Sequence, residues 1–115
     1  MSLAIKAEFE EIRRLAFGSI APAAFTGIGA AFLHAPRMVI LQNFTDNTLT
    51  FSDDGIKDKL DLLAGTYIIL DLTSNKTIEQ GFCLEQGTRL YVRYYDGAPT
   101  LGFVSLSVIY GTTGL

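Results

Sequence analysis

The chain is poor in the residue types on which several classes of site depend. It has one cysteine, one histidine and no tryptophan among 115 residues. A single cysteine excludes a disulfide within the chain, and a single histidine excludes a cupin-type metal site, which needs several histidine ligands. The net charge of −3 disfavours a nucleic-acid-binding surface, because such a surface needs a basic stripe. No run of about 18 apolar residues predicts a membrane span.

The composition that remains is typical of one folded domain. Hydrophobic residues make up 49% and charged residues 18% of the chain, whereas disordered chains are poor in apolar residues and rich in net charge. Glu8, Glu10 and Glu11 stand where a secretion signal would carry its apolar segment. We therefore expect a protein that is made in a cytoplasm.

The first residues show a helical pattern. Ile5, Phe9 and Ile12 fall at i, i+4 and i+7, which predicts a short amphipathic helix near residues 4–14. A helix this short needs a surface to dock on. We divide the chain into an N-terminal helix or arm, residues 1–14, and a single β-sandwich domain, residues 15–115. Two interpretations of the arm stay open: it docks on a neighbouring subunit or host particle, or it caps its own sandwich.

The rest of the chain reads as short extended runs between turns. Turn signals every eight to twelve residues or so favour an antiparallel β-sandwich of the jelly-roll or Greek-key kind. A hairpin is predicted across Thr45–Asn47. The expected strands cover residues 15–20, 23–32, 38–44, 48–52, 60–63, 66–72, 81–84, 89–95 and 101–110. The predicted core consists of Val39, Leu41, Leu49, Phe51, Ile68, Leu70, Val92, Val104, Leu106 and Val108.

Few residue patterns suggest chemistry. Cys83 lies in a predicted buried strand, where a cysteine behaves as a small hydrophobe. His34 has no nucleophile elbow to work with. Gly27-Ile28-Gly29 lacks the context of a dinucleotide-binding turn and fits a bent strand. The Asp53-Asp54-Gly55 segment lacks calcium-ligand spacing, so we expect a turn there. The chain is expected to hold no cofactor and no metal.

One strand is both aromatic and basic. Tyr91, Arg93, Tyr94 and Tyr95 could form a stacking platform for a sugar or a partner surface, since Tyr and Arg dominate interface hot spots. The alternative is a strand with one half-exposed face, where Tyr is simply a good strand former. The candidate partner-binding residues are therefore Ile5, Phe9, Ile12, Tyr91, Arg93, Tyr94 and Tyr95.

Four segments, residues 13–20, 37–55, 65–76 and 87–111, together resemble a group of small virion structural proteins of tailed bacteriophages. The shared motifs are an R-x-L-A-F-G-S-I start, an N-x-T-D to F-S-x-D-G region, an L-D-x-x-S-N-K turn and a final V-x-V-I-Y-G strand. The resemblance implies a non-enzymatic particle component on the capsid, neck, collar or tail. We expect a homo-oligomer that contacts other virion proteins, because a symmetric assembly would bury the excess apolar surface of this chain. We expect no direct contact with nucleic acid or with a membrane. The alternative function is a carbohydrate- or receptor-binding β-sandwich module.

Overall fold

The computed structural model describes residues 5–72 and 86–113, and these fold into two antiparallel sheets packed face to face. The prediction of an all-β antiparallel sandwich is confirmed. The only helical element among the described residues is a 3-10 turn, η1 (Phe17–Ser19). The strands are β1 (Ile5–Phe9), β2 (Arg13–Ala16), β3 (Thr26–Gly27), β4 (Met38–Asn43), β5 (Leu49–Ser52), β6 (Leu60–Leu62), β7 (Tyr67–Asp71), β8 (Tyr91–Arg93) and β9 (Phe103–Thr113).

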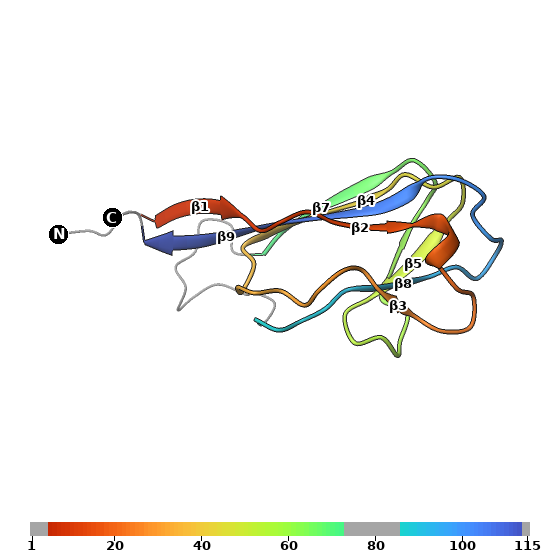
Figure 1. Ribbon diagram of the computed structural model, residues 1–115, viewed down its shortest axis with the longest axis horizontal. Coiled ribbons are helices and arrows are strands. Elements are labelled where there is room, and N and C mark those ends of the chain that lie inside the picture. Colours follow the sequence, from red (N-terminus) through yellow and green to blue (C-terminus); the bar gives the residue numbers. More distant parts are fainter. Residues whose placement is uncertain (1–4, 73–85, 114–115) are drawn as a thin grey trace.

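The long strand β9 organises the first sheet, here called sheet A. Its order is β1-β9-β4-β7, and β2 pairs with β9 further along the same edge as β1. The second sheet, sheet B, has the order β3-β8-β5-β6. Figure 1 shows that β1 and the end of β9 form a two-stranded ribbon extending beyond the sandwich. The molecule is consequently elongated, with extents of 55 × 23 × 21 Å.

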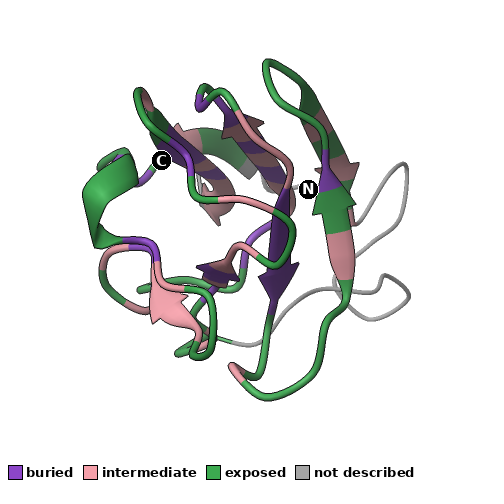
Figure 2. Ribbon diagram, turned by 90° about the vertical axis from the view of Figure 1, so that its right-hand side faces the viewer, coloured by how far each residue is buried: buried purple, intermediate pink, exposed green. Residues whose placement is uncertain are grey.

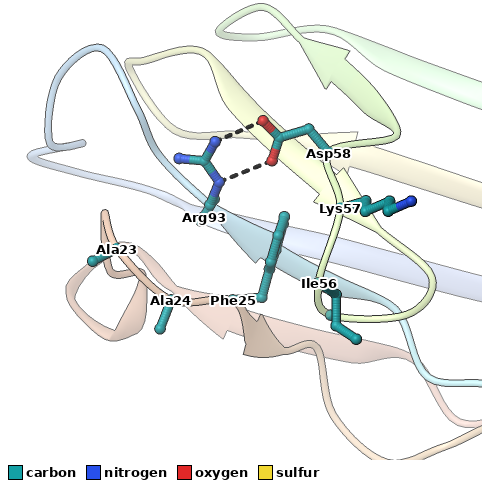
Figure 3. A pocket seen from close by; sticks show the side chains of 8 residues that line it. Ala23, Ala24, Phe25, Ile56, Lys57, Asp58 and Arg93 are labelled. Carbon is teal, nitrogen blue, oxygen red and sulfur yellow. Dashed lines mark hydrogen bonds and ion pairs between the residues drawn. The ribbon is translucent and has the colours of Figure 1, made fainter.

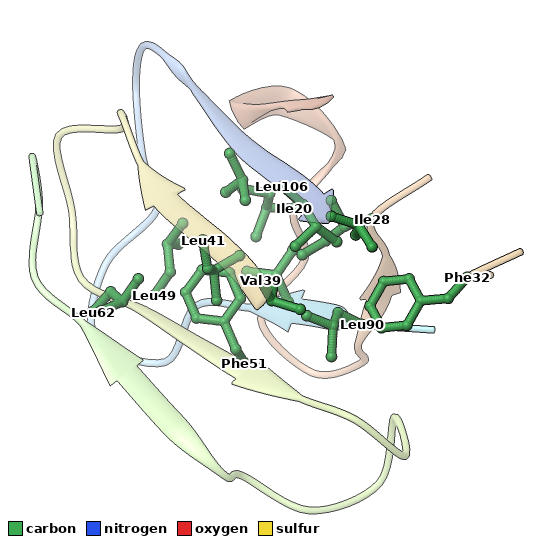
Figure 4. Packing of buried hydrophobic residues seen from close by; sticks show 13 residues of the cluster. Ile20, Ile28, Phe32, Val39, Leu41, Leu49, Phe51, Leu62, Leu90 and Leu106 are labelled. Carbon is green, nitrogen blue, oxygen red and sulfur yellow. The ribbon is translucent and has the colours of Figure 1, made fainter. Parts of the chain in front are cut away.

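The core lies between the two sheets (Figure 4), and its inward-facing positions follow the predicted alternation. Eight of the ten predicted core residues are buried; Ile68 and Leu70 are half-buried and pack against the others. Viewed along the long axis, the buried residues line the space between the sheets and most of the connecting loops are exposed (Figure 2). Five residues that the predicted core did not include also join it: Ile20, Ile28, Phe32, Leu62 and Leu90.

The predicted N-terminal helix is wrong, because Ile5–Phe9 is a strand. The segment Ile5-Lys6-Ala7-Glu8-Phe9 alternates apolar and charged residues, and this period of two is the pattern of a strand. Lys6 Nζ lies 3.3 Å from Glu8 Oε1. Residues two positions apart are neighbours on one face of a strand but not on a helix. All five residues of β1 pair with the edge of β9, and this pairing is available where an isolated short helix would be marginal in water.

A β-bulge separates β1 from β2. Phe9 is opposite Ile109 and Arg13 is opposite Leu106, so four steps on the N-terminal side match three steps on β9. One extra residue in one strand is the definition of a bulge. The bulge keeps both Glu10 and Arg13 on the inner side of sheet A, where both are buried.

The predicted hairpin across Thr45–Asn47 is also wrong. β4 pairs with β7 and β9 in sheet A, whereas β5 pairs with β6 and β8 in sheet B. The turn residues therefore carry the chain from one sheet to the other. Local turn chemistry cannot distinguish the two outcomes, because the pairing partners lie far away in sequence.

Several expected strands are shorter than predicted. The run 15–20 gives way to the 3-10 turn after Ala16, and only Thr26–Gly27 of the run 23–32 pairs with another strand. The expected strand 81–84 and its Cys83 lie outside the described residues.

Candidate functional site

The three N-terminal candidates do not form the expected helical stripe. Phe9 is 68% exposed and Ile12 is 39% exposed, but Phe9 lies in β1 and Ile12 lies in the bulge. The backbone of Ile5 pairs with Thr113. The strand is thus attached to β9 of its own chain, and Phe9 points to the outer face of sheet A beside Ile109.

The aromatic and basic strand is split between two environments. Tyr91 and Arg93 pair with Ser52 and Thr50 on the outer side of sheet B, while Tyr94 packs against the core. Tyr95 is 56% exposed and its ring lies 5.9 Å from the Arg93 guanidinium carbon. The structure therefore brings Arg93 and Tyr95 together, but the three tyrosines do not form one platform.

Arg93 instead lies in an open pocket of about 640 Å³ on the outer side of sheet B. Its Nε and Nη2 donate to the two carboxylate oxygens of Asp58, at 2.9 and 2.7 Å (Figure 3). Its guanidinium also lies 5.6 Å from the ring of Phe25. The hydrogen bonds from Arg93 lower the pKa of Asp58, and those to Asp58 raise the pKa of Arg93. Sequence reasoning missed Phe25, because the surrounding segment is rich in Ala and Pro and shows no regular alternation of apolar and polar residues.

A second ion pair is buried under the bulge. Glu10 Oε1 accepts from Arg13 Nη2 at 2.7 Å, and the two side chains are only 2% and 7% exposed. Arg13 also donates to the carbonyl oxygens of Ala30 and Ala31. Burial raises the pKa of Glu10, but the hydrogen bonds it accepts outweigh burial, and the pKa lies below its usual value. The pair fastens the N-terminal strand to the 29–34 loop.

The single histidine belongs to the same cluster. His34 Nδ1 lies 2.9 Å from Glu10 Oε2, and because a carboxylate only accepts, this ring nitrogen carries the hydrogen. The imidazole stacks on Tyr110, with centroids 3.6 Å apart, and the Tyr110 hydroxyl donates to Glu8 at 2.8 Å. His34 is therefore engaged in attaching the N-terminal strand.

The N-x-T-D motif, one of those that carry the virion-protein resemblance, builds a turn around Asn43. Asn43 is fully buried, and its amide donates to the carbonyl oxygens of Asn47, Leu62 and Leu63. Its Oδ1 accepts from the backbone and hydroxyl of Thr45, at 3.0 and 2.6 Å. This side chain links the end of β4 in sheet A to the end of β6 in sheet B.

The Asp53-Asp54-Gly55 segment forms the expected turn. The Asp54 carboxylate accepts from the backbone amides of Lys57 and Ile56 and from the Ser52 hydroxyl, and these bonds hold its pKa well below the usual range. Gly55 has φ of 73°, a conformation that favours glycine. Within residues 5–72 and 86–113, no group of three His, Cys, Asp or Glu side chains could hold a metal ion.

The outer face of sheet A carries several exposed apolar side chains, and sequence reasoning did not single it out. On β4, Val39 and Leu41 point into the core, so Met38 and Ile40 point outward. On β7, Tyr67 and Ile69 point outward and are 64% and 50% exposed. Both strands are apolar on their two faces. The signal was present in the runs Met38–Leu41 and Tyr67–Leu70, because a sheet with one solvated face normally alternates.

Three rows of paired residues define this outer face. One row is Phe9–Ile109–Met38–Asp71, the middle row is Ser107–Ile40–Ile69, and the third is Arg14–Ser105–Gln42–Tyr67. Beyond the third row, Phe44 and Phe103 lie with their ring centroids 5.1 Å apart and are 46% and 37% exposed. No described helix is long and apolar enough to span a membrane.

Comparison with known proteins identifies no family for this chain. No family model matches the chain, and no curated protein matches it. A chain from the disulfide-linked pili that form Bacillus endospore appendages aligns over 96% of this chain and 90% of its own length, with 11% identity and a TM-score of 0.44. At this level of similarity the match indicates nothing about what this chain does.

Proposed function

We propose that this chain is a non-enzymatic structural protein of a tailed-bacteriophage virion, which self-associates and attaches to the capsid, neck, collar or tail. It is made in the host cytoplasm and then incorporated into the particle. The resemblance of residues 13–20, 37–55, 65–76 and 87–111 to virion proteins supports the virion assignment. The resemblance supports a class of protein and leaves the position on the particle open.

The observation that carries the proposal is the apolar outer face of sheet A. Five large side chains on or beside this face are exposed: Phe9, Phe44, Tyr67, Ile69 and Phe103. Large contiguous apolar patches are uncommon on proteins that work alone, and they mark interaction sites. An assembly that buried this face would account for strands that are apolar on both sides.

The proposal is tested on particles. Virions are purified by density gradient from a culture that produces this chain, and their proteins are identified by quantitative mass spectrometry. We expect the chain to co-purify at a fixed ratio to the major capsid protein through two successive gradients. Recovery only in the soluble fraction of the lysate would contradict the proposal.

A second candidate is a carbohydrate-binding module, favoured by the pocket around Arg93. The pocket places a carboxylate that accepts, a guanidinium that donates and an aromatic ring within one cavity, which is the combination that orients a small polar ligand. A glycan array tests it with Phe25→Ala and the control Phe17→Ala, which changes an exposed ring outside the pocket. Binding that is lost only in Phe25→Ala would support this candidate; no binding by the parent chain would reject it.

A further inference from the structure

We propose that the outer face of sheet A binds the same face of a second copy of this chain, related by a two-fold axis. The inference rests on the proposed self-association and specifies its surface and its geometry. The proposed surface consists of the three rows of paired residues on the outer face of sheet A and the Phe44–Phe103 pair beyond them. A two-fold dimer needs a surface that is complementary to itself, both in its apolar residues and in the placement of its charges.

Part of the face is an apolar patch formed by Ile40, Ile69, Met38 and Ile109, which Ser107 and Gln42 border. Ile40 is opposite Ile69 on one side and Ser107 on the other, and Met38 is opposite Ile109. Side chains on two such faces interdigitate when sheets stack about 10 Å apart. A second sheet is therefore the natural cover for this surface.

The area suits a weak dimer. Four strands side by side are about 19 Å wide, and six residues of β4 are about 20 Å long. This gives roughly 380 Å² of flat area per copy, or roughly 760 Å² for two copies before side-chain relief is counted. Interfaces below about 1,200 Å² in total are typical of weak association.

The charges on the rows favour a second copy over an unrelated partner. Arg14 and Asp71 stand at diagonally opposite corners, and Phe9 and Tyr67 stand at the other two. Arg14 and Asp71 are both exposed, and neither side chain has a partner within the described part of the chain. Glu11 lies in the bulge, outside the rows.

A two-fold axis along the diagonal from Phe9 to Tyr67 brings these charges together. Asp71 of each copy then lies against Arg14 of the other, and the rings of Phe9 and of Tyr67 lie near their own equivalents. The strands of the two copies cross at about 90°, one of the two common arrangements of packed sheets. Both charges, which have no partner among the described residues, acquire a partner of opposite sign in this arrangement.

The first experiment is sedimentation velocity of the full chain from about 1 to 100 μM, a range that reports dissociation constants in the micromolar region. We expect the parent chain to dimerise and Ile69→Arg to weaken dimerisation by at least about tenfold, because the variant places an unpaired charge in the middle row of the face. The matched control is Ile56→Arg, since Ile56 is 79% exposed on a loop of sheet B. Circular dichroism melting shows that each variant is folded.

The second experiment tests the geometry by charge exchange. Arg14→Asp and Asp71→Arg should each weaken the dimer, and the double variant should restore it. A parent chain that stays monomeric, an Ile56→Arg variant as weakened as Ile69→Arg, or a double variant weaker than both single ones would overturn the inference. A monomeric chain that is still recovered at a fixed ratio from purified virions would leave the proposed virion role standing, so the two failures are distinguishable.

Discussion

Two arginine–carboxylate pairs with the same closest contact lie in opposite regions of this molecule. Arg13 Nη2 and Glu10 are 2.7 Å apart under the N-terminal bulge, and Arg93 Nη2 and Asp58 are also 2.7 Å apart in the pocket of sheet B. The side chains of the first pair are 7% and 2% exposed, whereas those of the second are 21% and 54% exposed. The two ion pairs therefore differ in burial and not in contact distance.

The difference in burial implies a difference in role. Water screens an exposed pair, so its net contribution to stability is small. A buried pair costs desolvation when it forms, but removal of one partner leaves a buried charge without compensation. The Glu10 pair is therefore a fixed attachment of the first strand, and the Asp58 pair is a polar surface that can exchange partners.

The largest effect is expected for Glu10→Ala. This change leaves the Arg13 guanidinium buried without its counter-charge, and we expect the free energy of unfolding to fall by about 3–5 kcal/mol. Chemical denaturation at neutral pH measures the change. The matched control is Glu11→Ala, at the exposed neighbouring position, which should resemble the parent; equal losses in the two variants would mean that burial of the pair is unimportant.

A buried uncharged group tests whether burial alone is sufficient. Asn43→Ala removes the partner of three backbone carbonyl groups and of Thr45, and we expect a loss of about 1–3 kcal/mol. Asn47→Ala is the control, because Asn47 is half-buried in the same turn. Denaturation curves of the two variants with unchanged slopes would compare them directly; a smaller loss for Asn43→Ala would contradict the assignment of Asn43 as the link between the sheets.

These effects bear on how much of the fold the sequence could predict. Period-two patterns were sufficient for the sandwich class and for most of the core, because burial of one face is a local property of a strand. They failed where two patterns overlapped. Ile5, Phe9 and Ile12 fit a helix, while Ile5, Ala7 and Phe9 fit a strand, and only the distant edge of β9 decides between them.

The candidate sites were less predictable for a related reason. Glu10 and Arg13 are three positions apart, but the other contacts join residues that are far apart in sequence, as in Arg93 with Asp58 and His34 with Glu10. Tertiary contacts of this kind leave no spacing to detect. By contrast, the outward apolar residues of β4 and β7 were visible in the sequence as runs without alternation, but such runs are also expected of strands covered on both faces within one chain.

The pH dependence of stability gives a further test of the buried Glu10–Arg13 pair. The pKa of Glu10 is below its usual 4.5 in the folded chain, so the carboxylate stabilises the fold above its unfolded pKa and loses this contribution as the pH falls through the folded value. We expect the stability difference between the parent and Glu10→Gln to be constant at neutral pH and to shrink below about pH 4.5. Other carboxylates with lowered pKa values contribute equally to both proteins, so the difference isolates Glu10. A difference that grows on acidification would contradict the assignment.

The smallest effect is expected for Asp58→Ala. Asp58 is 54% exposed, and Arg93 keeps a hydrogen bond to the carbonyl oxygen of Pro22 at 3.2 Å, so the melting temperature should stay close to that of the parent. Salt provides the sharper comparison, since ions screen exposed charges and reach buried ones poorly. Any deficit of Asp58→Ala should vanish when the ionic strength is raised to about 1 M, while the deficit of Glu10→Ala should persist. If the two deficits respond to salt alike, the two pairs do not differ in the way that their burial implies.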